Sequence, residues 1–150
     1  MYNPSLAISY AERWAHSFNP DYYNFSNIGG DCTNFVSQCL HYAGIPMNYD
    51  RYGWFYVSLY NRSPAWTGVN EFWNFGTMNK GAGLKLTPCN LNDLRAGDII
   101  QLFNGQRYYH NLLVNSVSNG IKVSAHDNSA FNVPLSTYYY QDLRCALVSS

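Results

Sequence analysis

Apolar residues recur at helical spacing in two stretches of the first half of the chain. The first begins at Pro4, a residue that suits the opening turn of a helix, and repeats apolar side chains every four residues until about residue 19. The second covers residues 32–43 with the same period and stops at Gly44. Both stretches are predicted to be helices.

In the second half of the chain the pattern changes to short apolar runs between turn residues. Residues 45–67 show no sustained period and predict a long loop, which a short helix at about 69–75 follows. From about Leu84 onward we expect strands, the clearest of them at residues 98–103, 108–117, 121–125 and 143–148. Helices followed by an antiparallel sheet predict an α+β fold. No linker or repeat divides residues 1–150, so we expect one domain.

The chain is rich in aromatic residues and poor in charge. Charged residues make up 12% of it and aromatic residues 17%, and the formal net charge is +0. Without a positive field, binding to nucleic acid is not expected, whereas Tyr and Trp side chains suit sugars and peptides. No apolar run is long enough to span a membrane or to serve as a signal peptide at the start of the chain. We expect a monomer without an export signal of its own.

One of the four cysteines has the setting of a nucleophile. Cys32 follows two glycines and Asp31 at the predicted start of a helix, where unpaired N–H groups and the helix dipole stabilise a thiolate. We therefore expect the pKa of Cys32 to lie below the ~8.5 of a free thiol. The alternative is that Cys32 is merely a small apolar residue at a helix start, since buried free cysteines are common, and Cys39 fits a purely structural role of this kind well. No Cys or His spacing suits zinc, so no metal or other cofactor is expected.

A cysteine nucleophile needs a base, and His110 is the histidine best placed to supply one. It heads an apolar strand in which alternation puts it on the same face as Leu112 and Val114. That face is expected to point toward the core and the helix that packs there. The alternative is a core histidine whose hydrogen bonds are satisfied.

The group that orients the imidazole of His110 depends on the register of the following hairpin. A three-residue loop at 118–120 would place Asn128 opposite His110, with His126 diagonal on the same face. A two-residue loop would switch the face and make Asp127 the diagonal neighbour. The apolar alternation of residues 121–125 favours the second register, and spacing alone leaves the choice open.

The residues around Cys32 resemble the hallmark of a known family. The run from Gly29 to Leu40, GGDCTNFVSQCL, is similar to that of the bacterial putative amidase domain family, a branch of the papain-like cysteine hydrolases related to NlpC/P60 and CHAP cell-wall enzymes. Other blocks agree across nearly the whole chain: YAERW at 10–14, SPAWT at 63–67, AGDII at 96–100, His110, AHDN at 125–128 and PL at 134–135.

The resemblance implies a papain-like, NlpC/P60-type fold with N-terminal helices on an antiparallel sheet. It further implies a cysteine hydrolase that cleaves amide or peptide bonds of peptidoglycan through a thioacyl-enzyme, outside the cell or at the cell wall, as a module of a larger protein. Cys32 would be the nucleophile and His110 the base, and the family positions favour His126 and Asn128 as the orienting groups. Asp127 stands where a hydroxyl residue is usual in the family.

Two other functions remain alternatives. A cell-wall-binding module without catalysis would also use Tyr- and Trp-rich loops, although it would not need both Cys32 and His110. An acyltransferase or transpeptidase would use the same acyl-enzyme and would differ only in the group that attacks it.

Overall fold

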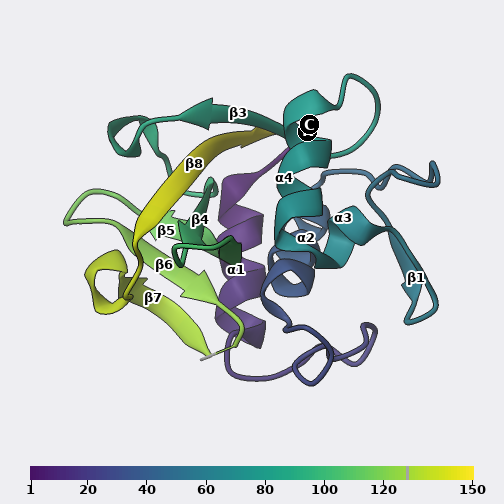
Figure 1. Ribbon diagram of the computed structural model, residues 1–150, viewed down its shortest axis with the longest axis horizontal. Helices are drawn as coiled ribbons and strands as arrows, with labels where there is room; N and C mark the ends of the chain where they lie inside the picture. Colours follow the sequence, from purple (N-terminus) through teal and green to yellow (C-terminus); the bar gives the residue numbers. More distant parts are fainter. Residues whose placement is uncertain (128) are drawn as a thin grey trace.

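Helices cover one face of a six-stranded antiparallel sheet in the computed structural model, which describes residues 1–127 and 129–150 (Figure 1). The helices are α1 (Pro4–Trp14), α2 (Cys32–Tyr42), α3 (Pro64–Thr67) and α4 (Val69–Met78). The strands of the sheet, in the order β3-β8-β4-β5-β6-β7, are β3 (Lys85–Cys89), β8 (Asp142–Ser149), β4 (Ile99–Phe103), β5 (Tyr108–Ser116), β6 (Lys122–Ala125) and β7 (Ala130–Pro134). The predicted α+β class is confirmed.

Both helices predicted in the first half of the chain are present. The side chain of Asn3 accepts a hydrogen bond from the backbone N–H of Ser5 at 3.1 Å, so α1 begins at Pro4 as expected. It ends at Trp14, earlier than predicted, and the carbonyl oxygen of Trp14 accepts a hydrogen bond from the ring of His126 at 2.7 Å. The second helix, α2, matches its predicted range within one residue.

The structure contains short elements that the pattern did not predict. In the expected loop at 45–67, β1 (Tyr56–Ser58) and β2 (Asn61–Arg62) pair with each other, and α3 follows them. Elements of two to four residues are too short to show a period. Strand β7 was also not predicted, and Asn132 in its middle has a left-handed φ of 56°. Two 3-10 turns, at Leu91–Asp93 and Leu135–Thr137, complete the elements of the described residues.

Apolar side chains cover both faces of the sheet, and this overturns one prediction. Leu113 belongs to the core cluster that packs against the helices. Leu112 and Val114 belong to a second cluster on the opposite face, and the ring of His110 lies 5.7 Å from that of Tyr138, which packs against this second cluster. The expectation that His110 shares the helix-packed face is therefore wrong. The run LLV supplies apolar residues to both faces, so its pattern does not show which face the helix covers.

The hairpin between β5 and β6 follows neither of the two predicted registers throughout. Near the turn, Ser116 pairs with Lys122, which is the register of the three-residue loop. An irregularity then shifts the pairing by one residue, so that Val114 pairs with Val123. Extended to the start of β5, the shifted register sets position 110 opposite position 127.

Helix α4 packs closely on β3 at Gly76. A Cβ atom at this position would lie 2.4 Å from Cγ of Leu86. We expect Gly76→Ala to lower the free energy of unfolding, because overpacking of about 1–3 kcal/mol exceeds the gain of up to about 1 kcal/mol in helix propensity. Urea unfolding measures the change, with Gly81→Ala as control, since a Cβ there meets nothing closer than 3.7 Å. An unchanged or raised free energy for Gly76→Ala would show that Leu86 moves aside without strain.

Candidate functional site

Cys32 is the first residue of α2 and lies against the start of β5. Its side chain is buried, and Sγ lies 4.0 Å from the carbonyl oxygen of Tyr109 and 3.7 Å from Oγ1 of Thr33. The backbone N–H of Asn111 also acts on this sulfur. The backbone groups on either side of His110 therefore face the Cys32 thiol.

Burial decides the protonation state of Cys32. It raises the pKa of the thiol to about 11, and the hydrogen bonds from the N–H of Asn111 and from Thr33 reduce this effect only in part. The charge of Asp127 raises the pKa further. The expectation of a pKa below that of a free thiol is wrong, because loss of hydration outweighs the N–H groups that favour the thiolate. At neutral pH the sulfur carries its proton.

His110 is buried at the start of β5, where the backbone on either side of it faces this thiol. Burial lowers the pKa of its imidazole, and the carboxylate of Asp127 opposes the shift. Nε2 of His110 is buried and has no hydrogen-bond partner in the part of the chain that the structure describes. No hydrogen bond therefore joins Nε2 to Sγ of Cys32 in this arrangement.

Asp127 joins the turn after β6 to the start of α2. Both of its carboxylate oxygens accept the backbone N–H of Asp31, at 3.1 Å and 2.8 Å. Gly30 makes this approach possible, since a Cβ there would lie 2.7 Å from Oδ2 of Asp127, and the φ of +98° also favours glycine. The carboxylate thus lies where its charge acts on both Cys32 and His110.

His126 points to a different set of partners. Its Nδ1 lies 2.5 Å from Oδ2 of Asp31, its Nε2 lies 2.7 Å from the carbonyl oxygen of Trp14, and its ring stacks on Phe35 at 4.0 Å. A carbonyl oxygen only accepts, so Nε2 is the donor in the bond to Trp14. With both nitrogens engaged, His126 is not brought to the imidazole of His110. The remaining predicted residue, Asn128, lies outside the described residues.

Asn111 is a candidate that sequence reasoning missed. It is fully buried on β5, and neither Nδ2 nor Oδ1 of its side chain has a hydrogen-bond partner among the described residues. Alternation places it on the face of Leu113, which packs against the helices, and opposite Gln101. A polar residue within an apolar strand was the available signal. An unpartnered buried amide is rare enough to need an explanation, and contact with a bound substrate is one.

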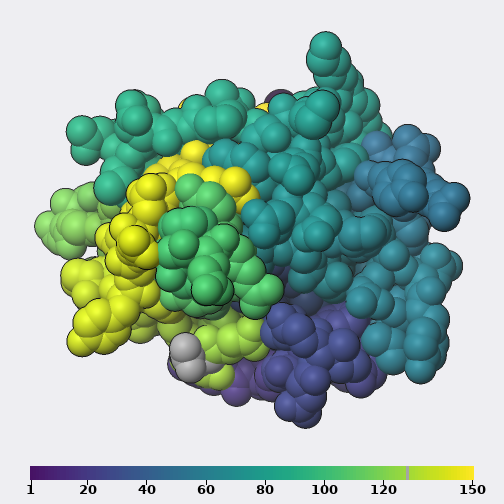
Figure 2. Space-filling model, viewed as in Figure 1, coloured from purple at the N-terminus to yellow at the C-terminus, as the bar shows by residue number. Residues whose placement is uncertain are grey.

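The surface near these residues is hollowed. On the face seen in Figure 2, the segment that leads into α2, the connection between β4 and β5, and the region of α3 and α4 surround a depression. The first of these segments ends at Cys32, and the second leads into β5 and His110.

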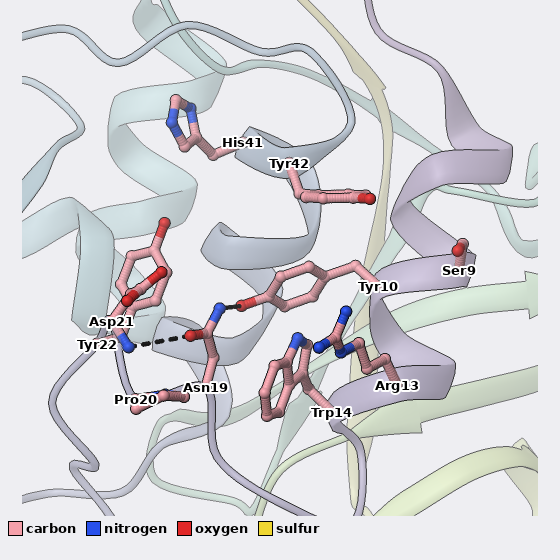
Figure 3. Close-up of a pocket in the computed structure, with 10 residues that line it drawn as sticks. All are labelled: Ser9, Tyr10, Arg13, Trp14, Asn19, Pro20, Asp21, Tyr22, His41 and Tyr42. Atoms are coloured by element: carbon pink, nitrogen blue, oxygen red, sulfur yellow. Dashed lines mark hydrogen bonds between the residues drawn. The ribbon is translucent and has the colours of Figure 1, made fainter.

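A separate cavity of about 620 Å³ lies between α1, the loop at 19–22 and the last turn of α2, at the other end of α2 from Cys32 (Figure 3). Aromatic rings of Tyr10, Trp14 and Tyr42 face it, and the amide of Asn19 bonds to the hydroxyl of Tyr10 at 3.0 Å. It is not part of the Cys32 site.

No group of three or more His, Cys, Asp or Glu side chains is arranged to hold a metal ion within residues 1–127 and 129–150. Over the same residues, no helix has the length and apolar character needed to cross a membrane.

Comparison with known proteins places the chain in a family. Residues 1–148 match the family model described as "Putative amidase domain". The chain is 34% identical over 113 residues to "Uncharacterized protein YhbB" of Bacillus subtilis (strain 168), an alignment that covers 72% of this chain and 35% of that protein. It is 27% identical over 143 residues to "Uncharacterized protein YjcM" of the same organism, covering 89% and 32%. The chain spans about a third of the length of these curated relatives.

No solved structure matches the chain significantly. The family model, in contrast, covers almost every residue, including the helix start at Cys32 and the strand that carries His110. The protein therefore belongs to the putative amidase domain family.

Proposed function

We propose that the protein is a cysteine amidase that cleaves an amide or peptide bond of bacterial peptidoglycan through a thioacyl-enzyme. The observation that carries the proposal is the position of Cys32 at the start of α2, with its sulfur against the backbone on both sides of His110. Membership of the family supports amide hydrolysis. Resemblance to NlpC/P60 and CHAP enzymes supports a papain-like fold, the peptidoglycan substrate and a location at the cell wall.

The resting pair is a neutral thiol and a neutral imidazole. Burial raises the pKa of Cys32 and lowers that of His110, so a preformed thiolate–imidazolium pair is disfavoured. The proton of Sγ passes to Nε2 of His110 as the sulfur attacks the substrate carbonyl, and His110 then protonates the leaving amine. This step requires Nε2 to approach Sγ when the substrate binds. Water finally attacks the thioester and restores the thiol.

Charge on the substrate oxygen needs donors beside Cys32. The N–H groups in the first turn of α2 point toward that end of the helix, where the helix dipole also favours negative charge. The side-chain amide of Asn111 is a second candidate donor. It is buried and has no partner among the described residues, and the backbone N–H of the same residue acts on Sγ. In this proposal, Asn111 binds the oxyanion.

Asp127 is the group that we propose to stabilise the His110 imidazolium. Its charge raises the pKa of His110, which is the effect needed when the imidazole holds the proton of the thiol. His126 then has a positioning role, since its two nitrogens hold Asp31 and α1. His126 and Asn128, which the family resemblance favours, are the competing candidates for the orienting group.

Loss of the nucleophile or the base tests the reaction. We expect Cys32→Ala and His110→Ala each to lower the rate of product release from purified peptidoglycan by at least ~1,000-fold, because neither group has a substitute. Cys89→Ser is the control and should keep the parent rate. Mass spectrometry of the products identifies the bond and separates hydrolysis from transfer.

The same assay tests the role of a metal. Activity should survive EDTA and be abolished by thiol alkylation, since the mechanism needs only sulfur and imidazole. Parent-like activity of Cys32→Ala, or loss with EDTA that zinc reverses, would contradict a cysteine mechanism.

The orienting group can be identified from pH profiles. The acid limb of kcat/KM follows protonation of His110, because only the neutral imidazole accepts the thiol proton. Asp127 raises the pKa of His110, so Asp127→Asn should move this limb to lower pH and reduce the rate about 10-fold or more.

His126→Gln is the matched comparison for Asp127→Asn. It breaks the buried bond to Asp31, so it should lower the thermal midpoint and leave the acid limb in place. A shift of the limb in His126→Gln, with none in Asp127→Asn, would assign the orienting role to His126.

A second function, binding of wall glycan, is favoured by the cavity between α1 and α2. The ring centroids of Tyr10 and Tyr42 are 5.2 Å apart, and Trp14 adds a third aromatic surface (Figure 3). Arg13 and Asp21 provide one positive and one negative charge, which suits a neutral ligand with both donors and acceptors, such as a sugar. Its volume lies in the range of small-molecule sites, roughly 300–1,000 Å³.

Glycan binding can be measured without turnover in the Cys32→Ala protein. We expect tri-N-acetylchitotriose to bind, and Tyr42→Ala to weaken the binding about 5-fold or more, because an exposed ring that stacks on the sugar is removed. Calorimetric titration gives the affinity, with Tyr139→Ala as control, since Tyr139 is also an exposed tyrosine but lies outside the cavity. Equal weakening by both variants, or no binding, would reject this second function.

A further inference from the structure

Two cysteines outside the Cys32 site lie directly opposite each other in the sheet. Cys89 ends β3, and in the antiparallel pairing of β3 with β8 its partner is Cys145. Both are free thiols in this structure. The proposed hydrolysis uses neither of them.

The pairing meets the geometric requirement for a disulfide. Opposed residues of antiparallel strands have Cα atoms about 4.5–5.5 Å apart, and disulfides join Cα atoms about 4.4–6.8 Å apart. Opposed side chains also project from the same face of the sheet. In agreement with this, Cys145 belongs to the second core cluster and Cys89 packs against that cluster.

An oxidant can reach the pair from one side. Cys89 is half-buried and Cys145 is buried, and both line an open cavity of about 400 Å³ beside the turn at 90–92. Burial raises the pKa of Cys145 to about 12, and it raises that of the more accessible Cys89 as well. The order of reaction follows from accessibility, so Cys89 meets the oxidant first.

We propose that Cys89 and Cys145 are an oxidation site that forms a disulfide with a low-molecular-weight disulfide as oxidant. The thiolate of Cys89 attacks one sulfur of the oxidant, breaks its S–S bond and releases one small thiol. Cys145 then loses its proton to solvent and attacks the sulfur of Cys89, which releases the second small thiol. Two protein S–H bonds are replaced by one S–S bond, and the oxidant is reduced to two thiols.

The bond would fix β8 to the edge strand of the sheet. Strand β3 has β8 as its only neighbour in the described sheet, so its attachment rests on one ladder. The residue before Cys145 is Arg144, whose guanidinium lies between the rings of Trp73 and Tyr108 at 4.2 Å and 3.8 Å. Tyr108 begins β5, which carries His110, so the disulfide would tie the edge of the sheet to a strand that supports the site.

Mass spectrometry of the intact protein treated with oxidised glutathione tests the proposal. We expect the loss of two hydrogen masses without a glutathione adduct, a linked peptide pair containing Cys89 and Cys145, and reversal by dithiothreitol. The thermal midpoint should rise by about 5–10 °C, because the bond closes a long loop.

Single variants separate the two steps. Cys145→Ser should keep a stable glutathione adduct on Cys89, since the resolving thiol is gone, and Cys89→Ser should form neither the adduct nor the link. Cys39 is the internal control, because it is fully buried and should remain free until the protein is unfolded and alkylated. A lasting glutathione adduct on Cys89 in the parent protein, or a link to a different cysteine, would overturn the proposal.

Discussion

The buried carboxylate of Asp31 is the contact on which the arrangement at the start of α2 depends. Its two oxygens accept hydrogen bonds from the backbone N–H of Phe25, from the Asn34 amide and from the ring of His126. The loop before α2, the helix itself and the turn after β6 therefore meet at one side chain. A buried charge without such partners would be strongly unfavourable, so the position of Cys32, one residue later, is tightly constrained.

The same burial that fixes Cys32 also limits its reactivity at rest. N–H groups at a helix start favour a thiolate, but the removal of water from the sulfur has the larger effect on its pKa. Burial also lowers the pKa of the His110 imidazole, which favours its neutral form. In the proposed reaction both groups are uncharged at rest, and the ion pair forms only as the thiol attacks. The charge of Asp127 favours the imidazolium of His110 and disfavours the thiolate of Cys32.

Strand β5 is buried on both of its faces. Leu112 and Val114 fill the cluster on one face, and Leu113 fills the cluster under the helices. The polar residues at the start of the strand follow the same division. The ring of His110 lies near Tyr138 of the far cluster, whereas Asn111 lies on the helix-packed face next to α2. His110 and Asn111 therefore project from opposite faces of this strand, and only the face of Asn111 packs against the helices.

The sequence by itself determined the two long helices, the α+β class and the place of Cys32 at a helix start, because capping residues and helical periodicity act over only a few neighbouring positions. The tertiary structure decided the rest of the site. The shift in pairing between β5 and β6, the face on which His110 lies and the engagement of both nitrogens of His126 all depend on residues far apart in the chain. The protonation of Cys32 belongs to the same class, since the extent of burial is set by the whole fold and outweighed the local effect of the helix start.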